Sequence, residues 1–208
     1  MLDVCDEPVL GALGGSVRRT TLDGGAWVDL RRSWLTGSGP VFERLVQMVP
    51  WRAEKRPMYD KVVAVPRLLC FYGEDVPLPH PLLEAALGAL NAHYGAELGE
   101  SFRTAGLCLY RDGRDSVAWH GDTIGRGRTQ DTMVAILSLG TPRPLLLRPR
   151  VKGAWELGGS RPLRFEVGHG DLLVMGGSCQ RTWEHAVPKT ARPVGPRISV
   201  QFRPRGVR

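Results

Sequence analysis

Apolar residues in the first half of the chain recur at helical spacing in two segments. The first, residues 41–48, lies between Pro40 and Pro50, and proline favours the ends of a helix over its interior. The second follows Pro81 and carries leucines at helical spacing as far as Gly95, which suits a C-terminal cap. The pattern predicts two helices and leaves the rest of the first 60 residues unassigned.

After about Phe102 the pattern changes to short β-prone runs separated by glycine and proline. These runs cover residues 106–110, 116–120, 132–139, 145–147, 163–167, 171–175, 182–186 and 198–202. Short strands at this spacing are typical of a sandwich or barrel. Since the helices precede the strands, a doubly wound parallel sheet is disfavoured. We predict a mainly β fold with flanking helices: a double-stranded β-helix, or jelly roll, packed against N-terminal helices.

Composition supports one folded domain. The chain has 208 residues, 42% of them hydrophobic, which is enough for a substantial core. No apolar run approaches the roughly 20 residues that span a bilayer, and the first residues do not resemble a secretory signal. The cysteines are scattered without a CxxC pair, at Cys5, Cys70, Cys108 and Cys179. We therefore expect reduced thiols in a cytoplasmic protein without a membrane segment.

The chain is strongly basic, with a net charge of +7 and a pI of about 9.7. This charge favours a polyanionic partner such as nucleic acid. Most of the basic residues are arginine, whose planar guanidinium donates two parallel hydrogen bonds to phosphate. A GC-rich genome also enriches arginine, glycine and alanine, so base composition is an alternative explanation of the same bias.

His120-Gly121-Asp122 is the first of two His-Gly-Asp tripeptides in the chain. In an extended segment residues i and i+2 point to the same face, so this imidazole and carboxylate can meet at one metal ion. His185, roughly 60 residues downstream, can supply a third ligand. Two histidines and one carboxylate on one face leave positions open, as is typical of non-haem Fe(II) oxygenases.

The second tripeptide, His169-Gly170-Asp171, serves as an internal control. Only His185 follows it, 16 positions later, and that gap holds little more than one hairpin. Its surroundings are typical of a tight turn that enters a strand, so we predict that Asp171 caps the turn. For His185 a hydrogen-bonded structural histidine at a strand end is the alternative, and the residue taken alone would favour it.

Near the C-terminus, polar and apolar residues alternate. One face of an extended segment would carry Arg197, Ser199, Gln201 and Arg203. A surface strand would show the same pattern. Two arginines about 20 Å apart along a strand can, however, reach toward a pocket between them, because their side chains are long. Such a pocket suits a dicarboxylate such as 2-oxoglutarate, whose 2-oxo acid end chelates iron.

Several segments resemble the AlkB family of Fe(II)- and 2-oxoglutarate-dependent dioxygenases. Residues 109–122 resemble the segment that leads into the metal pair, and residues 138–140 and 169–175 resemble two later strand segments of the family. Residues 180–189 resemble the distal-histidine segment of animal homologues that repair alkylated bases. Residues 196–203 resemble the closing R-x-N-x-T-F-R strand. The ordered match extends from near residue 66 to residue 203.

The resemblance implies specific roles. His120, Asp122 and His185 would bind Fe(II). Arg197 would bind the distal carboxylate of 2-oxoglutarate with help from Tyr110, Ser199 would belong to the same site, and Arg203 would lie near the chelating end. Residues 66–73 resemble the edge of a nucleotide-recognition lid. The candidate substrate residues are Tyr59, Arg67, Phe71, Trp119 and Trp183, and core packing remains an equal alternative for the aromatic rings.

The implied reaction is oxidative dealkylation of a damaged base, which consumes O2 and releases formaldehyde. The implied partner is nucleic acid, DNA before RNA, and a monomer is expected. RNA, protein or a small metabolite as substrate, and a non-catalytic nucleic-acid-binding protein, remain alternatives. We expect one domain over residues 1–208, with the helices and lid in 1–100 and the jelly roll in 101–208.

Four positions depart from the family pattern. Cys108 replaces the asparagine of an N-x-Y motif, and Ser199 and Gln201 replace asparagine and threonine of the closing strand. Ile124 stands where many relatives carry an acid that helps to read the methylated base. The identity of the base is therefore left open, while the metal and cosubstrate residues match the family.

Overall fold

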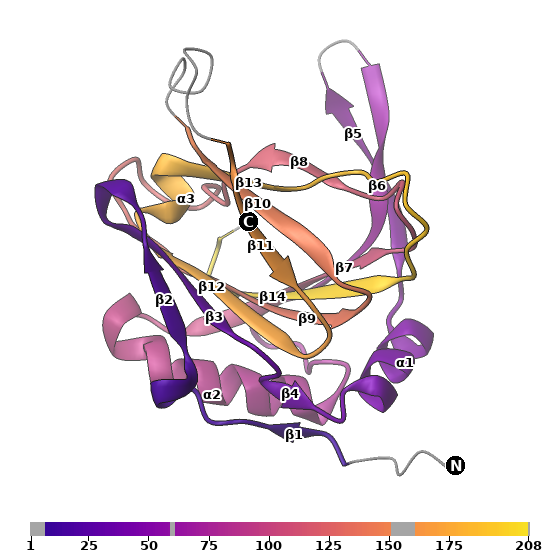
Figure 1. Cartoon of the computed structure of the whole chain (residues 1–208), viewed down its shortest axis with the longest axis horizontal. Coiled ribbons are helices and arrows are strands. Elements are labelled where there is room, and N and C mark those ends of the chain that lie inside the picture. Colours follow the sequence, from indigo (N-terminus) through magenta and orange to yellow (C-terminus); the bar gives the residue numbers. More distant parts are fainter. Residues whose placement is uncertain (1–6, 59–60, 151–160, 208) are drawn as a thin grey trace.

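The computed structural model describes residues 7–58, 61–150 and 161–207, and two antiparallel sheets dominate it (Figure 1). The larger sheet contains, in order, β2 (Arg18–Thr21), β3 (Ala26–Arg31), β12 (Asp171–Gly177), β9 (Val134–Gly140), β14 (Arg197–Pro204), β7 (Phe102–Tyr110), β6 (Lys61–Tyr72) and β5 (Arg52–Met58). The smaller sheet contains β11 (Leu163–Val167), β10 (Arg143–Pro149), β13 (Trp183–Val187) and β8 (Val117–His120). A short pair joins β1 (Val9–Leu10) to β4 (Leu35–Thr36). The predicted jelly roll is confirmed.

Both predicted helices are present. They are α1 (Gly39–Met48) and α2 (Pro81–Leu98). The predicted cap at Gly95 is wrong: Gly95 lies inside α2, and its carbonyl accepts a hydrogen bond from the amide of Gly99. Gly99 has a φ of 74°, the left-handed conformation that ends many helices. No helix in the described ranges has the length and apolar character needed to cross a bilayer.

Strands also come from the N-terminal half, which the sequence pattern did not predict. β2, β3, β5 and β6 all join the larger sheet, so the expectation that helices precede the strands is wrong. The physical reason is clearest in β3, where the consecutive residues Trp27, Val28 and Asp29 are all buried. A strand buried on both faces lacks the alternation of apolar and polar residues that reveals a half-exposed strand.

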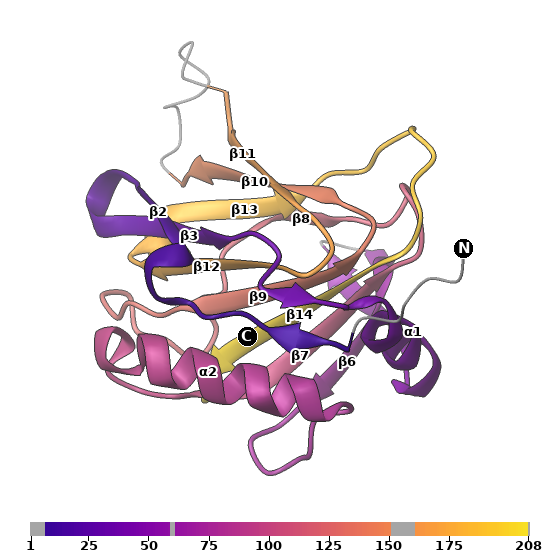
Figure 2. The same ribbon diagram turned by 60° about the horizontal axis from the view of Figure 1, so that its bottom comes forward.

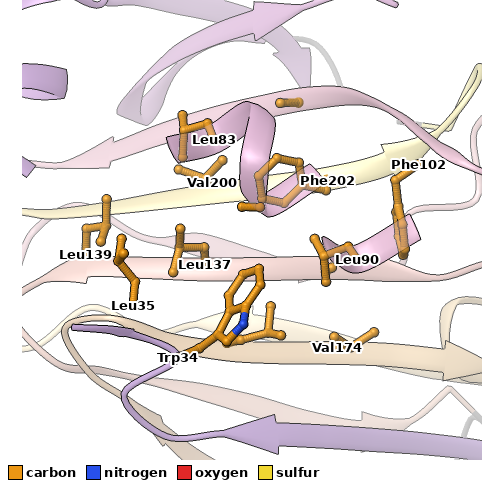
Figure 3. Packing of buried hydrophobic residues seen from close by; sticks show 14 of the residues in the cluster. Trp34, Leu35, Leu83, Leu90, Phe102, Leu137, Leu139, Val174, Val200 and Phe202 are labelled. Carbon is orange, nitrogen blue, oxygen red and sulfur yellow. The ribbon is translucent and has the colours of Figure 1, made fainter. Parts of the chain in front are cut away.

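The helices cover the outer face of the larger sheet, and Figure 2 shows α2 running along it. One apolar cluster fills this layer and includes Trp34, Leu83, Leu90, Val200 and Phe202 (Figure 3). A second cluster lies between the two sheets and includes Leu147, Leu173 and Met175. Each sheet thus packs against an apolar layer, and the space between the two sheets also holds the polar residues described below.

β14 lies in the interior of the larger sheet, between β9 and β7. Its apolar residues belong to the helix-side cluster, and Arg197 and Ser199 on the opposite face are each 2% exposed. A surface strand is therefore excluded. The predicted strands of the second half are all present, although most begin or end one to four residues away from the predicted limits.

Candidate metal and cosubstrate site

Three side chains from two strands converge between the sheets. β8 ends at His120, Asp122 follows two residues later, and the antiparallel pairing of β8 with β13 places His185 opposite His120. Their ligand atoms lie within 4.8 Å of one another, and Nε2 of His120 is 3.5 Å from Oδ1 of Asp122. This is the metal cluster predicted from the sequence, and two histidines with one carboxylate match an Fe(II) site with open positions.

Neighbouring groups hold the ligands in place. Nδ1 of His120 is 2.8 Å from the carbonyl of Ala118, which leaves Nε2 to face the cluster. The backbone amide of Asp122 donates to Oε1 of Gln180, at 2.9 Å, in the short helix α3 (Cys179–Thr182). Gln180 was not among the predicted site residues, because its contact with Asp122 joins positions 58 residues apart in the chain. Its place in the segment that leads to His185 is the only local signal.

The protonation states of the cluster suit a metal ion. Burial opposes ionisation of Asp122, but Arg203, His185 and His120 outweigh it and lower the pKa of this carboxyl to about 2. Burial, reinforced by His120, lowers the pKa of His185 to about 3. At neutral pH the carboxylate is therefore charged and the imidazole is neutral, which are the forms that bind metals.

Arg203 lies at the metal end of β14. Its Nε and Nη2 contact Oδ2 of Asp122 at 2.9 and 2.8 Å, and its side chain is 11% exposed. The guanidinium thus neutralises the only carboxylate of the metal cluster. This position agrees with the expectation that Arg203 lies near the chelating end of a cosubstrate.

Arg197 lies at the opposite end of β14 and is 2% exposed. Its Nε donates to the hydroxyl of Ser138 at 2.9 Å, but its buried Nη1 has no hydrogen-bond partner among the described residues. The ring of Tyr110 lies 5.3 Å from this guanidinium, and burial raises the pKa of Tyr110 to about 12. A buried guanidinium nitrogen requires an acceptor, so this end suits the distal carboxylate of a dicarboxylic acid.

The sequence model of the 2OG-Fe(II) oxygenase superfamily matches residues 69–203, the segment that contains all of these side chains. The chain belongs to this superfamily. Membership implies Fe(II), 2-oxoglutarate and O2, and the residues of the oxygenase fit them: the triad offers nitrogen and oxygen ligands, and Arg197 offers an unpaired donor.

The oxygenase also resembles individual AlkB proteins. It is 33% identical over 192 residues to the alpha-ketoglutarate-dependent dioxygenase alkB homolog 3 of Bos taurus, a match that covers 85% of this chain and 63% of the relative. It is 27% identical over 230 residues to the DNA oxidative demethylase ALKBH2 of Arabidopsis thaliana, which covers 89% and 69%. The chain thus spans about three fifths of the length of the alkB homolog 3 proteins.

The fold has a counterpart among solved structures. That of OsALKBH1 superimposes with a TM-score of 0.62 at 14% identity, covering 90% of this chain and all of the other. This likeness concerns the fold alone. The sequence relatives confirm the predicted resemblance to the AlkB family.

The predicted substrate residues of the oxygenase do not gather at one place. Tyr59 lies outside the described residues. Arg67 donates to the carbonyl of Ser116, and Phe71 is 46% exposed on β6 opposite Gly106. The two tryptophans have other surroundings.

Trp119 lies under the guanidinium of Arg148, 4.3 Å away, and its neighbour His120 faces the metal cluster. Consecutive strand residues point to opposite faces, so Trp119 is directed away from the ligands. Trp183 is 7% exposed in the cluster between the sheets, where its Nε1 donates to the carbonyl of Asp23. Of the predicted rings in the described residues, Phe71 is the most exposed.

The second tripeptide of the oxygenase forms a turn. Asp171 accepts hydrogen bonds from the backbone amides of Gly168 and Ser33, both at 2.8 Å, and pairs with Arg32. Nδ1 of His169 accepts from the amide of Gly140 at 2.7 Å. The prediction that Asp171 caps this turn is confirmed.

Proposed function

We propose that this oxygenase oxidatively dealkylates N-alkylated bases of nucleic acid. The observation that carries the proposal is that the His120–Asp122–His185 cluster lies near one end of β14, while Arg197, whose buried Nη1 has no partner among the described residues, lies at the other end. The named relatives support the same chemistry, since one is a dioxygenase of the alkB type and another a DNA oxidative demethylase.

The residues divide the work along β14. Arg197 and Tyr110 bind the distal carboxylate, and Arg203 lies where the 2-oxo acid end approaches the metal ligands. His120, Asp122 and His185 would hold Fe(II), and a set of three protein ligands would leave positions for 2-oxoglutarate and O2. The bound iron and cosubstrate supply the oxidising chemistry, in which O2 and 2-oxoglutarate give succinate, CO2 and a hydroxylated N-alkyl carbon. That carbon then leaves as formaldehyde and the base is restored.

The proposed partner is nucleic acid, with DNA preferred over RNA. A net charge of +7 favours a polyanion, and β5 adds the exposed basic residues Arg52 and Lys55 beside β6. Phe71 on β6 offers an exposed ring for stacking. A base within a duplex would have to leave the stack to reach the metal, so unpaired strands should react fastest.

The direct test is succinate formation from 2-oxoglutarate with Fe(II) and single-stranded DNA and RNA that carry one methylated base each. Because Ile124 is 67% exposed and brings no carboxylate, the panel needs both cationic and neutral methylated bases. We expect base-dependent succinate and formaldehyde in equal amounts, both lost in His185→Ala. If no oligonucleotide stimulated succinate formation, the proposal would be contradicted. A preference for RNA would make RNA the substrate in place of DNA.

A further inference from the structure

Gln201 lies on the polar face of β14 between Ser199 and Arg203 and contacts both. Its Oε1 accepts a hydrogen bond from Nη2 of Arg203 at 2.7 Å. Its Nε2 donates to the hydroxyl of Ser199 at 3.3 Å and to the sulfur of Cys108 at 3.5 Å. A guanidinium can only donate, so the amide oxygen must face Arg203. Both ends of the amide are therefore occupied in one orientation.

Arg203 in turn separates the two oxygens of Asp122. Its Nε and Nη2 both contact Oδ2, whereas Oδ1 is the oxygen that lies 3.5 Å from Nε2 of His120. Oδ1 thus faces the cluster of ligand atoms, and Oδ2 is held by the guanidinium. Gln201 reaches this carboxylate only through Arg203.

Gly106 provides the space for this arrangement on the neighbouring strand β7. A Cβ at position 106 would lie 2.8 Å from Nη1 of Arg203 and 3.5 Å from Oε1 of Gln201. Contacts below 3.0 Å are essentially unknown for real Cβ atoms, so any side chain here would displace the guanidinium. The chain therefore combines a glycine that leaves room with an amide that fixes the position.

We propose that Gln201 is a positioning residue that holds Arg203 on Oδ2 of Asp122, ready for the carboxylate at the 2-oxo acid end of 2-oxoglutarate. This inference rests on the proposed function, because it assumes that 2-oxoglutarate binds between Arg197 and the metal ligands. Without the amide, Arg203 keeps its charge but loses its fixed direction. Removing one hydrogen bond to a charged group should weaken 2-oxoglutarate binding about ten-fold.

The experiment compares two binding constants without turnover. Gln201→Met keeps the length of the side chain and removes the amide, and Gln47→Met, on the exposed face of α1, is the matched control. Mn(II) binding is measured first without 2-oxoglutarate, and 2-oxoglutarate binding is then measured on the Mn(II)-loaded protein. We expect Gln201→Met to weaken 2-oxoglutarate about ten-fold while Mn(II) binds as tightly as before or more tightly. Gln47→Met should change neither constant.

A double-mutant cycle separates positioning from general damage. If Gln201 acts through Arg203, then Gln201→Met added to Arg203→Met should cause no further loss of 2-oxoglutarate binding. Three outcomes would each overturn the inference. The losses of 2-oxoglutarate binding in the two single variants could add fully in the double variant. Gln201→Met could weaken the binding of Mn(II) and 2-oxoglutarate equally, or it could bind 2-oxoglutarate normally. Wild-type protein that binds 2-oxoglutarate but demethylates no base would refute the proposed substrate alone. Wild-type protein that does not bind 2-oxoglutarate would refute both.

Discussion

The two His-Gly-Asp tripeptides share their sequence and differ in everything around them. In residues 120–122 the imidazole and the carboxylate turn toward His185 between the two sheets. In residues 169–171 the same groups bind backbone amides of neighbouring segments. The polar side chains of the first tripeptide form the candidate ligand site, and those of the second stabilise the fold.

Strand pairing explains the difference. His120 ends a strand whose partner, β13, presents a second histidine directly opposite. Gly170 instead has a φ of 78° in a turn before β12, and a Cβ there would lie 2.1 Å from the carbonyl oxygen of Leu35. A short motif therefore acquires its chemistry from the segment that the sheet places across from it, and five substitutions test this contrast.

The largest expected effect is the difference in Mn(II) affinity between variants of the two aspartates. Asp122→Ala removes a ligand and leaves Arg203 without its carboxylate partner. Mn(II) affinity and succinate formation should each fall by more than about 100-fold, since the loss of a residue that only supports a ligand already lowers affinity or activity about 10- to 100-fold. Asp171→Ala should leave Mn(II) affinity unchanged. Equal losses in both variants would abolish the distinction between the tripeptides.

The free energy of unfolding should rank the same two variants in the opposite order, with Asp171→Ala the more strongly affected. Asp171→Ala leaves the amides of Gly168 and Ser33 and the guanidinium of Arg32 without their acceptor. We expect the free energy of unfolding in urea to fall by about 3 kcal/mol, because hydrogen bonds to a charged group contribute about 1.5 to 3 kcal/mol each. A loss below about 1 kcal/mol would show that the turn does not need its carboxylate.

The two central glycines provide a third contrast. Gly170→Ala forces a side chain into a left-handed conformation against Leu35 and should destabilise the protein by about 2 kcal/mol. Gly121→Ala would press on the carbonyl of Gln180, 2.4 Å from the new Cβ, and so disturb the support of Asp122. We expect weaker Mn(II) binding for Gly121→Ala and unchanged Mn(II) binding for Gly170→Ala, measured by titration.

The smallest effect concerns pH. Burial lowers the pKa of His169 below its usual 6.5, and the neutral ring accepts the hydrogen bond from Gly140. A depressed pKa means that this stabilisation is present above about pH 6.5 and is lost as the pH falls toward the folded-state pKa. The free energy of unfolding of the wild type should therefore fall relative to that of His169→Gln between about pH 7 and pH 5.5. Urea titration at each pH measures this difference. An advantage that stays constant with pH would contradict the assignment.

The triad could be predicted from the sequence because two of its three residues lie two positions apart in the chain. His120 and Asp122 share a face by strand geometry alone, and Arg197 and Arg203 share a face for the same reason. His185 could be chosen because few histidines follow the first tripeptide. Alternation of side chains along a strand was therefore enough to predict which of these side chains share a face.

The contacts that orient these residues could not be predicted in the same way. Ser138 and Gly106 act on the site across strand pairs, and Gln180 acts on it from α3. No periodicity in the chain records which elements become neighbours. β3 was missed for a different reason, since consecutive residues of this strand are buried and the chain shows no alternation there. Trp119 shows the opposite failure, because a ring next to a ligand in sequence faces away from it in space.

The position of β5 and β6 at the edge of the larger sheet makes them separable for engineering. β6 pairs with β7 over residues 68–72, and residues 61–64 pair with β5. The carbonyl of Pro66, between these two stretches, accepts a hydrogen bond from the amide of Ser116. Exchanging residues 52–66 for the hairpin of another family member would leave the register of β7 with β14 untouched. If the proposed function is correct, chimaeras built at this boundary should change nucleic-acid recognition while keeping the candidate Fe(II) and 2-oxoglutarate residues on their original strands.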